Sequence, residues 1–154
     1  MTANAVLRTF SVDNVCDAET AVMVGQRSAE DRARLVFDNW SPITGGAIKA
    51  PQLDEWFDVC RRSPGLEQLV MRTVGHAYAN GYQADGELVK KLAGETEIAL
   101  FEVRAYFNGS NNVRLLFARD SAGRIVFGFG GQKSHANWYE TAIPRAVRFI
   151  REQG

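Results

Sequence analysis

The stretch VRLLFARDSAGRIVFGFGGQKS, residues 113–134, predicts two β-strands joined by a tight turn. Apolar residues dominate 113–118, β-branched and aromatic residues alternate with glycines in 125–131, and the Ser-Ala-Gly-Arg at 121–124 has turn composition. So short a connection permits only antiparallel neighbours. No helix start follows closely enough to make the glycines of this stretch a phosphate-binding loop. We expect them to permit a bulge or a close approach; they are Gly128, Gly130 and Gly131.

A third strand is predicted just before this hairpin. Residues 98–107 alternate between apolar and polar side chains and are rich in β-formers. The turn-forming run Asn-Gly-Ser-Asn-Asn at 108–112 joins them to the strand at 113–120. These segments therefore predict a three-stranded antiparallel meander.

Helices are predicted on both sides of the meander. Residues 51–62 and 63–81 place apolar side chains at helical spacing and predict a helical hairpin, with Ser63 as the cap of its second helix. Residues 137–153 predict a closing helix, which Pro144 should kink or delay until about residue 143. The order predicts an α+β domain, a twisted antiparallel sheet with its helices on one face.

The first fifty residues read as an acidic extension that precedes a domain at 51–154. Residues 5–12 predict a short strand, and 28–40 predict a helix capped by Ser28. Residues 41–51 contain two prolines and a Gly-Gly, which predict a loop and a boundary. We expect a packing helix here, or alternatively a segment that covers part of the basic sheet.

The composition is that of an ordinary globular protein, with 45% hydrophobic and 23% charged residues in a chain of 154. The net charge is zero, but residues 87–154 carry ten Lys/Arg against seven Asp/Glu, so the acidic excess lies in residues 1–86. This balance argues against strong non-specific binding to nucleic acid and is compatible with a local cationic cleft.

The sequence predicts a cytoplasmic protein without a membrane partner. It contains no run of about 18 apolar residues, and its start lacks the basic and apolar regions of a secretion signal. Cys16 and Cys60 have no CxxC or histidine neighbours. We expect free thiols in a reducing compartment rather than a disulfide or a metal site.

Four motifs in order carry a family resemblance: ELVKKLAG at 87–94, LFEVRA at 100–105, the 113–134 hairpin, and IPRAVRFI at 143–150. With the helical pair at 51–81, they resemble the RelE/ParE superfamily of toxin–antitoxin toxins, in particular its HigB-like, phage-derived branch. The resemblance covers about 100 residues. It implies a RelE-like fold and a toxin that cuts mRNA on the ribosome, with mRNA, the ribosome and a cognate antitoxin as partners.

The chemistry that the resemblance implies is attack by a 2′-hydroxyl on the adjacent phosphate, without a metal or cofactor. Such a reaction needs a cation beside the phosphorane and groups that move protons. Arg104, Arg114 and Lys133 stand at the family's basic positions, and Ser134 replaces the second lysine of its Lys-Lys-Ser run. We therefore predict that Arg114 and Lys133 stabilise the phosphate and that Arg104 orients the RNA.

The remaining site predictions come from the segment after the hairpin and from the 87–94 motif. His135 and Tyr139 are predicted to move protons, because an imidazole titrates near neutral pH and a phenol can donate. Trp138 or Tyr139 is predicted to stack on a base, and either can instead be a core anchor of the closing helix. Lys90 and Lys91 are predicted to reach the RNA backbone, or otherwise to form a solvated face.

Alternatives to an enzyme stay open. Arg104 and Arg114 can pair with Glu102 or another carboxylate across the sheet instead of a phosphate. A non-enzymatic phage protein that uses the same fold to bind and inhibit a host protein is the second interpretation. A gyrase inhibitor in the manner of ParE relatives is the third.

Overall fold

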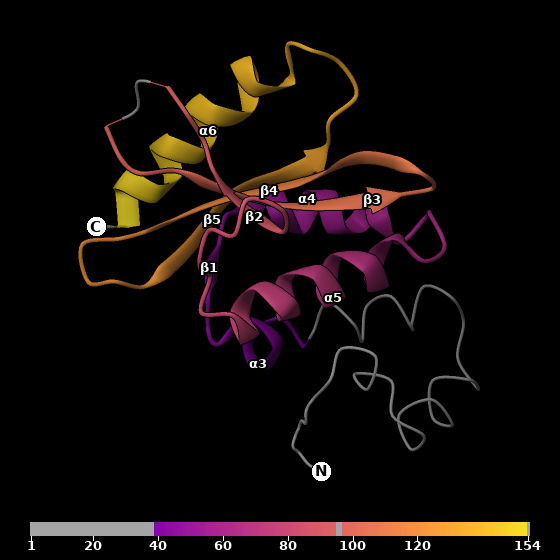
Figure 1. Ribbon diagram of the computed structural model, residues 1–154, viewed down its shortest axis with the longest axis horizontal. Helices are drawn as coiled ribbons and strands as arrows, with labels where there is room; N and C mark the ends of the chain where they lie inside the picture. Colours follow the sequence, from indigo (N-terminus) through magenta and orange to yellow (C-terminus); the bar gives the residue numbers. More distant parts are fainter. Residues whose placement is uncertain (1–38, 95–96, 154) are drawn as a thin grey trace.

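The computed structural model describes residues 39–94 and 97–153, which form an α+β fold around a five-stranded sheet (Figure 1). The predicted meander is confirmed, because β3 pairs with β4 and β4 with β5, both antiparallel. Two short strands flank it: β2 is antiparallel to β3, and β1 is parallel to β5. The sheet order is β1-β5-β4-β3-β2. The strands are β1 Ile48–Lys49, β2 Val89–Lys91, β3 Phe101–Phe107, β4 Ser110–Arg119 and β5 Ile125–Gln132.

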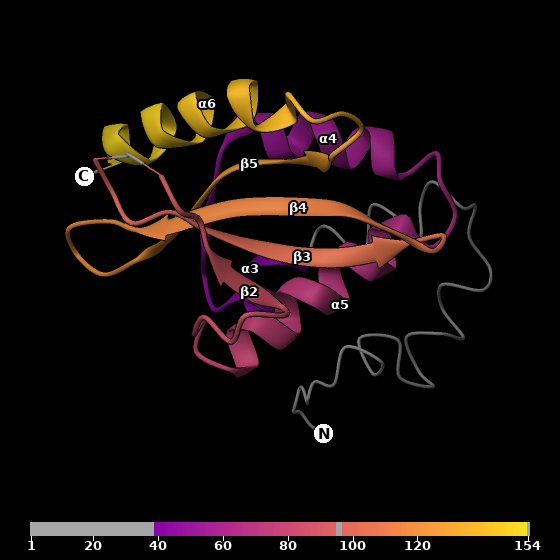
Figure 2. The same cartoon turned by 45° about the horizontal axis from the view of Figure 1, so that its top comes forward.

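Helices cover both faces of the sheet, so the prediction of helices on one face is wrong (Figure 2). Every second residue of β4 turns to the same side. Leu115 and Phe117 join the core under the N-terminal helices, whereas Leu116 and Ala118 join a second core under α6. Because β4 is apolar on both faces, each face needs a covering layer. The helices are α3 Trp40–Thr44, α4 Pro51–Cys60, α5 Leu66–Ala79 and α6 Trp138–Gln153.

The loop predicted at 41–51 is wrong, because this segment contains α3 and β1. The prolines and glycines predict a loop, but tertiary contacts stabilise a short helix and a short strand in this segment. The Trp40 indole N–H donates to the Ala47 carbonyl at 2.8 Å, and the Tyr82 hydroxyl donates to the Thr44 carbonyl at 2.6 Å. The predictions for residues 5–12 and 28–38 lie outside the described residues.

Two helix starts differ from the sequence predictions. The cap of α5 is Gly65, not Ser63, because the Ser63 carbonyl accepts from the Leu66 amide at 3.0 Å in a turn before the helix. The closing helix begins at Trp138 and continues through Pro144, so its start is not delayed. Trp138 is buried against the sheet, which holds the first turn in place.

The predicted roles of the glycines in β5 are confirmed. Leu116 pairs with Phe129 and Phe117 with Phe127, so the register skips Gly128 and forms a bulge. A Cβ on Gly128 would lie 2.7 Å from the Ala146 carbonyl oxygen of α6. The bulge also turns Phe127 and Phe129 to opposite faces, although they are two residues apart.

Candidate anion-binding site

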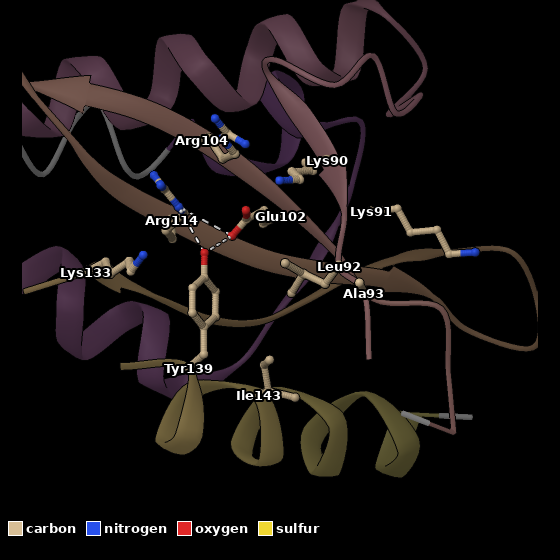
Figure 3. A pocket seen from close by; sticks show the side chains of 10 residues that line it. All are labelled: Lys90, Lys91, Leu92, Ala93, Glu102, Arg104, Arg114, Lys133, Tyr139 and Ile143. Atoms are coloured by element: carbon tan, nitrogen blue, oxygen red, sulfur yellow. Dashed lines mark hydrogen bonds and ion pairs between the residues drawn. The ribbon is translucent and has the colours of Figure 1, made fainter. Parts of the chain in front are cut away.

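A pocket of about 490 Å³ opens on the α6 side of the sheet, where β2, β3, β4 and α6 approach one another (Figure 3). Its volume lies within the usual range of small-ligand sites. Five basic side chains and one carboxylate line it, so its charge favours an anion. The lining residues are Lys90, Lys91, Leu92, Ala93, Glu102, Arg104, Arg114, Lys133, Tyr139 and Ile143.

Strand alternation and register bring the two arginines together. Glu102 and Arg104 are two residues apart on β3 and share one face. Arg104 lies directly opposite Arg114 of β4. Like charges at opposite positions destabilise a sheet, so the neighbouring carboxylate of Glu102 offsets part of this cost.

Glu102, Arg114 and the half-buried Tyr139 form a polar cluster at the base of the pocket (Figure 3). The Tyr139 hydroxyl donates to Glu102 Oε1 at 2.6 Å, and Arg114 Nε donates to the Tyr139 oxygen at 3.3 Å. Arg114 Nε also lies 3.4 Å from Glu102 Oε1, and both residues are buried. Burial, followed by the hydrogen bond to Glu102, raises the pKa of Tyr139, so its phenol stays protonated at neutral pH.

Lys133 reaches the pocket from the end of β5. Its backbone N–H donates to the Asn112 carbonyl at 2.6 Å, which continues the ladder with β4. Its Nζ lies 5.1 Å from the centre of the Tyr139 ring, within cation–π range. On the other edge of β5, the Gln52 side chain donates to the Gly130 carbonyl at 2.7 Å and accepts its N–H at 2.8 Å. β1 pairs only with Val126 and Phe127 of β5, so further along β5 the Gln52 side chain makes the hydrogen bonds that a neighbouring strand would make. These bonds fix the segment that leads to Lys133.

Arg104 and the two lysines of β2 differ in how they face the pocket. Arg104 lines the pocket half-buried, and its Nε is buried without a hydrogen-bond partner among the described residues. Figure 3 shows the Lys90 ammonium turned toward the pocket and the Lys91 ammonium turned away from it. Lys91 therefore contributes at the rim.

Two of the predicted site residues lie elsewhere. His135 is exposed in the turn before α6 and does not line this pocket; its carbonyl accepts from the Trp138 amide at 3.2 Å. Trp138 is 9% exposed, with its ring 5.6 Å from that of Phe129 and 5.2 Å from that of Tyr139, centre to centre. This position favours the core-anchor interpretation of Trp138.

Sequence reasoning named Glu102 only as an ion-pair partner of the arginines and did not place it in the site. Because Glu102 is two residues from Arg104 on a predicted strand, the alternation of side chains could have placed both on the same face. Nothing in the sequence indicates that Leu92, Ala93 and Ile143 form the apolar wall of the pocket. Its position depends on where α6 crosses the sheet.

Comparisons of the chain with protein families, curated proteins and solved structures found no match. Across residues 39–94 and 97–153, no helix has the length and apolar character needed to cross a membrane. The same ranges contain no group of three or more His, Cys, Asp or Glu side chains placed to hold a metal ion.

Proposed function

We propose that this protein is a RelE/HigB-like toxin that cleaves mRNA at the ribosome. The observation that carries the proposal is the meeting of Arg104, Arg114 and Lys133 with Tyr139 in one pocket. The four sequence motifs that resemble the RelE/ParE superfamily also support it, and two of them contain these same basic residues. A phosphodiester has the charge and size for such a pocket, and the half-buried Arg104 guanidinium that lines it is well suited to bind one.

In the proposed reaction, the 2′-oxygen of RNA forms a bond to the adjacent phosphorus while the bond to the 5′-oxygen breaks. The products are a 2′,3′-cyclic phosphate and a 5′-hydroxyl. Arg104, Arg114 and Lys133 stabilise the added charge on the phosphorane. The Tyr139 hydroxyl accepts the 2′-hydroxyl proton while it passes its own proton to the Glu102 carboxylate, and a water molecule protonates the leaving 5′-oxygen. Tyr139 and Glu102 together thereby take the role that the sequence assigned to His135 and Tyr139.

The test uses purified protein, ribosomes and an mRNA, with cleavage followed by primer extension. We expect Lys133→Ala and Arg104→Ala to slow cleavage by about 100-fold, as for other charge-stabilising donors. Tyr139→Phe keeps the ring and should slow cleavage by a similar factor through loss of its proton. Arg148→Ala is the matched control, because Arg148 is exposed on α6 and does not line the pocket.

A 2′-O-methyl group at the cut site should abolish cleavage, because the nucleophile is then absent. Full cleavage of that RNA, or full activity in all three pocket variants, would contradict the proposed chemistry.

A second candidate is an inactive RelE-fold protein that binds and inhibits a host protein. The observation in its favour is the cluster at the pocket base, where Arg114 already pairs with Glu102 and donates a hydrogen bond to Tyr139. On this hypothesis the ion pair is structural. Purified protein would then leave mRNA intact on ribosomes, and a pull-down from host lysate would return one protein and no ribosomes.

A further inference from the structure

An exposed aromatic ring lies on the same side of β3 as the pocket. Tyr106 is 64% exposed although it belongs to a strand. Its neighbours Ala105 and Phe107 contribute to the core under α4 and α5. The alternation of the strand therefore turns Tyr106 to the face that carries Arg104. Because the ring buries little area, the fold gains little from it.

The β3–β4 hairpin holds this ring beside the pocket. The chain reverses through Asn108 and Gly109, whose φ angles are 53° and 79°. The register shifts between Ala105 and Phe107, which leaves Tyr106 outside the regular pairing with β4. Residues two apart on a strand are separated by about 7 Å, so Tyr106 lies one such step beyond Arg104, just outside the residues that line the pocket.

We propose that Tyr106 is a nucleobase-stacking residue and that the pocket therefore takes single-stranded RNA in preference to duplex RNA. This inference rests on the proposed function and names a further part of its substrate site. A phosphate held by Arg104 and Lys133 leaves the base of an adjoining nucleotide near the open face of the sheet. There the Tyr106 ring offers a flat, exposed surface for stacking. In a duplex the bases are already stacked on one another and cannot reach the ring.

The test measures dissociation constants by fluorescence anisotropy at several salt concentrations. The probes are a 2′-O-methyl single strand, which cannot be cleaved, its duplex, and inorganic polyphosphate, which has charge but no bases. We expect Tyr106→Ala to weaken binding of the single strand about tenfold, as for other base-stacking aromatics. Binding of polyphosphate and the salt dependence should not change, and Tyr106→Phe should bind within about twofold of wild type.

Two further variants serve as comparisons: one removes a pocket charge, and the other removes a tyrosine far from the pocket. Lys133→Ala should weaken both the single strand and polyphosphate and should lower the slope of log K against log salt by about 0.7. Tyr78→Ala removes another tyrosine, 47% exposed on α5, the helix that packs on the opposite face, and should leave all three affinities unchanged.

The outcomes separate the inference from the function on which it rests. If wild type binds the single strand and Tyr106→Ala binds it equally well, stacking is wrong and the proposed function stands. Equal losses for RNA and polyphosphate in Tyr106→Ala would mean that the ring supports the pocket's structure, which also overturns stacking. If wild type binds none of the probes, the proposed function fails, and the inference fails with it.

Discussion

On the face covered by α3, α4 and α5, the sheet buries a continuous aromatic core, whereas on the face covered by α6 it buries an ion pair beside an open pocket. The first face contains Phe117, Phe127 and Tyr82, with ring centres 5.2 to 6.0 Å apart. On the second face, β3 and β4 bury Glu102 and Arg114. One layer therefore buries mainly apolar side chains, whereas the other buries a charged pair beside its own apolar core.

This difference follows from how much area each helical layer covers. Three helices cover the first face, and the single helix α6 crosses the second. The part of the second face that α6 leaves open is where Arg104, Lys90 and Lys133 gather. Such charged side chains stay hydrated at an open edge and would be costly under a complete layer.

The largest expected loss of stability comes from truncating an aromatic residue on the face covered by α3, α4 and α5. Phe117 is fully buried, and Phe117→Ala should lower the free energy of unfolding by about 4 kcal/mol. Phe129, on the other face, is 8% exposed and packs against Trp138. We expect Phe129→Ala to cost about 3 kcal/mol, because a site near solvent relaxes more easily. Denaturant unfolding measures both values, and a larger loss for Phe129→Ala would reverse the comparison.

The second effect concerns the buried ion pair. Arg114→Met should cost about 3 kcal/mol of unfolding free energy, because it leaves the Glu102 carboxylate buried without this partner. The double variant Arg114→Met/Glu102→Leu should recover to within about 1 kcal/mol of wild type, since apolar residues often replace such pairs without loss. It should also lose affinity for polyphosphate. A double variant as unstable as the single one would show that the pair is structural, as the second candidate function requires.

The sequence predicted the parts of this architecture that depend on strand periodicity. Alternation placed Arg104 and Glu102 on one face, and the hairpin brought Arg114 to them. The edge strands β1 and β2 were missed, because two or three residues form a strand only by pairing with β5 or β3. His135 lies beyond the end of β5, where alternation no longer determines the direction of a side chain. The position of Tyr139 depends on α6, whose face of the sheet was predicted wrongly.

The third effect compares two glycines of β5 that face opposite layers. A Cβ on Gly128 would lie 2.7 Å from the backbone oxygen of Ala146, whereas one on Gly130 would lie 2.4 Å from Cδ2 of Leu53 and 2.9 Å from Cε3 of Trp56. A helix backbone cannot shift out of the way as two side chains can. We expect Gly128→Ala to cost about 2 kcal/mol and Gly130→Ala about 1 kcal/mol. Thermal unfolding of the two variants checks the order, and equal losses would mean that α6 shifts as freely as a side chain.

The smallest effect is a pH dependence that reports how dry the aromatic face is. Burial, and next the nearby Glu67 carboxylate, raises the pKa of the Cys60 thiol from 9.0 to about 12. The unfolded chain therefore releases this proton at lower pH than the folded chain. The stability that the neutral thiol contributes is complete below pH 9 and is lost as the pH rises toward 12.

Between pH 8 and 10, wild type should lose on the order of 1 kcal/mol of unfolding free energy that Cys60→Ala does not lose. Denaturant unfolding at each pH measures the two slopes. The range stops at pH 10 because Tyr82 and Tyr139, whose pKa values are also raised by burial, add their own dependence above that value. Parallel slopes for wild type and Cys60→Ala would show that water reaches the thiol. The aromatic face would then be no drier than the face beside the pocket.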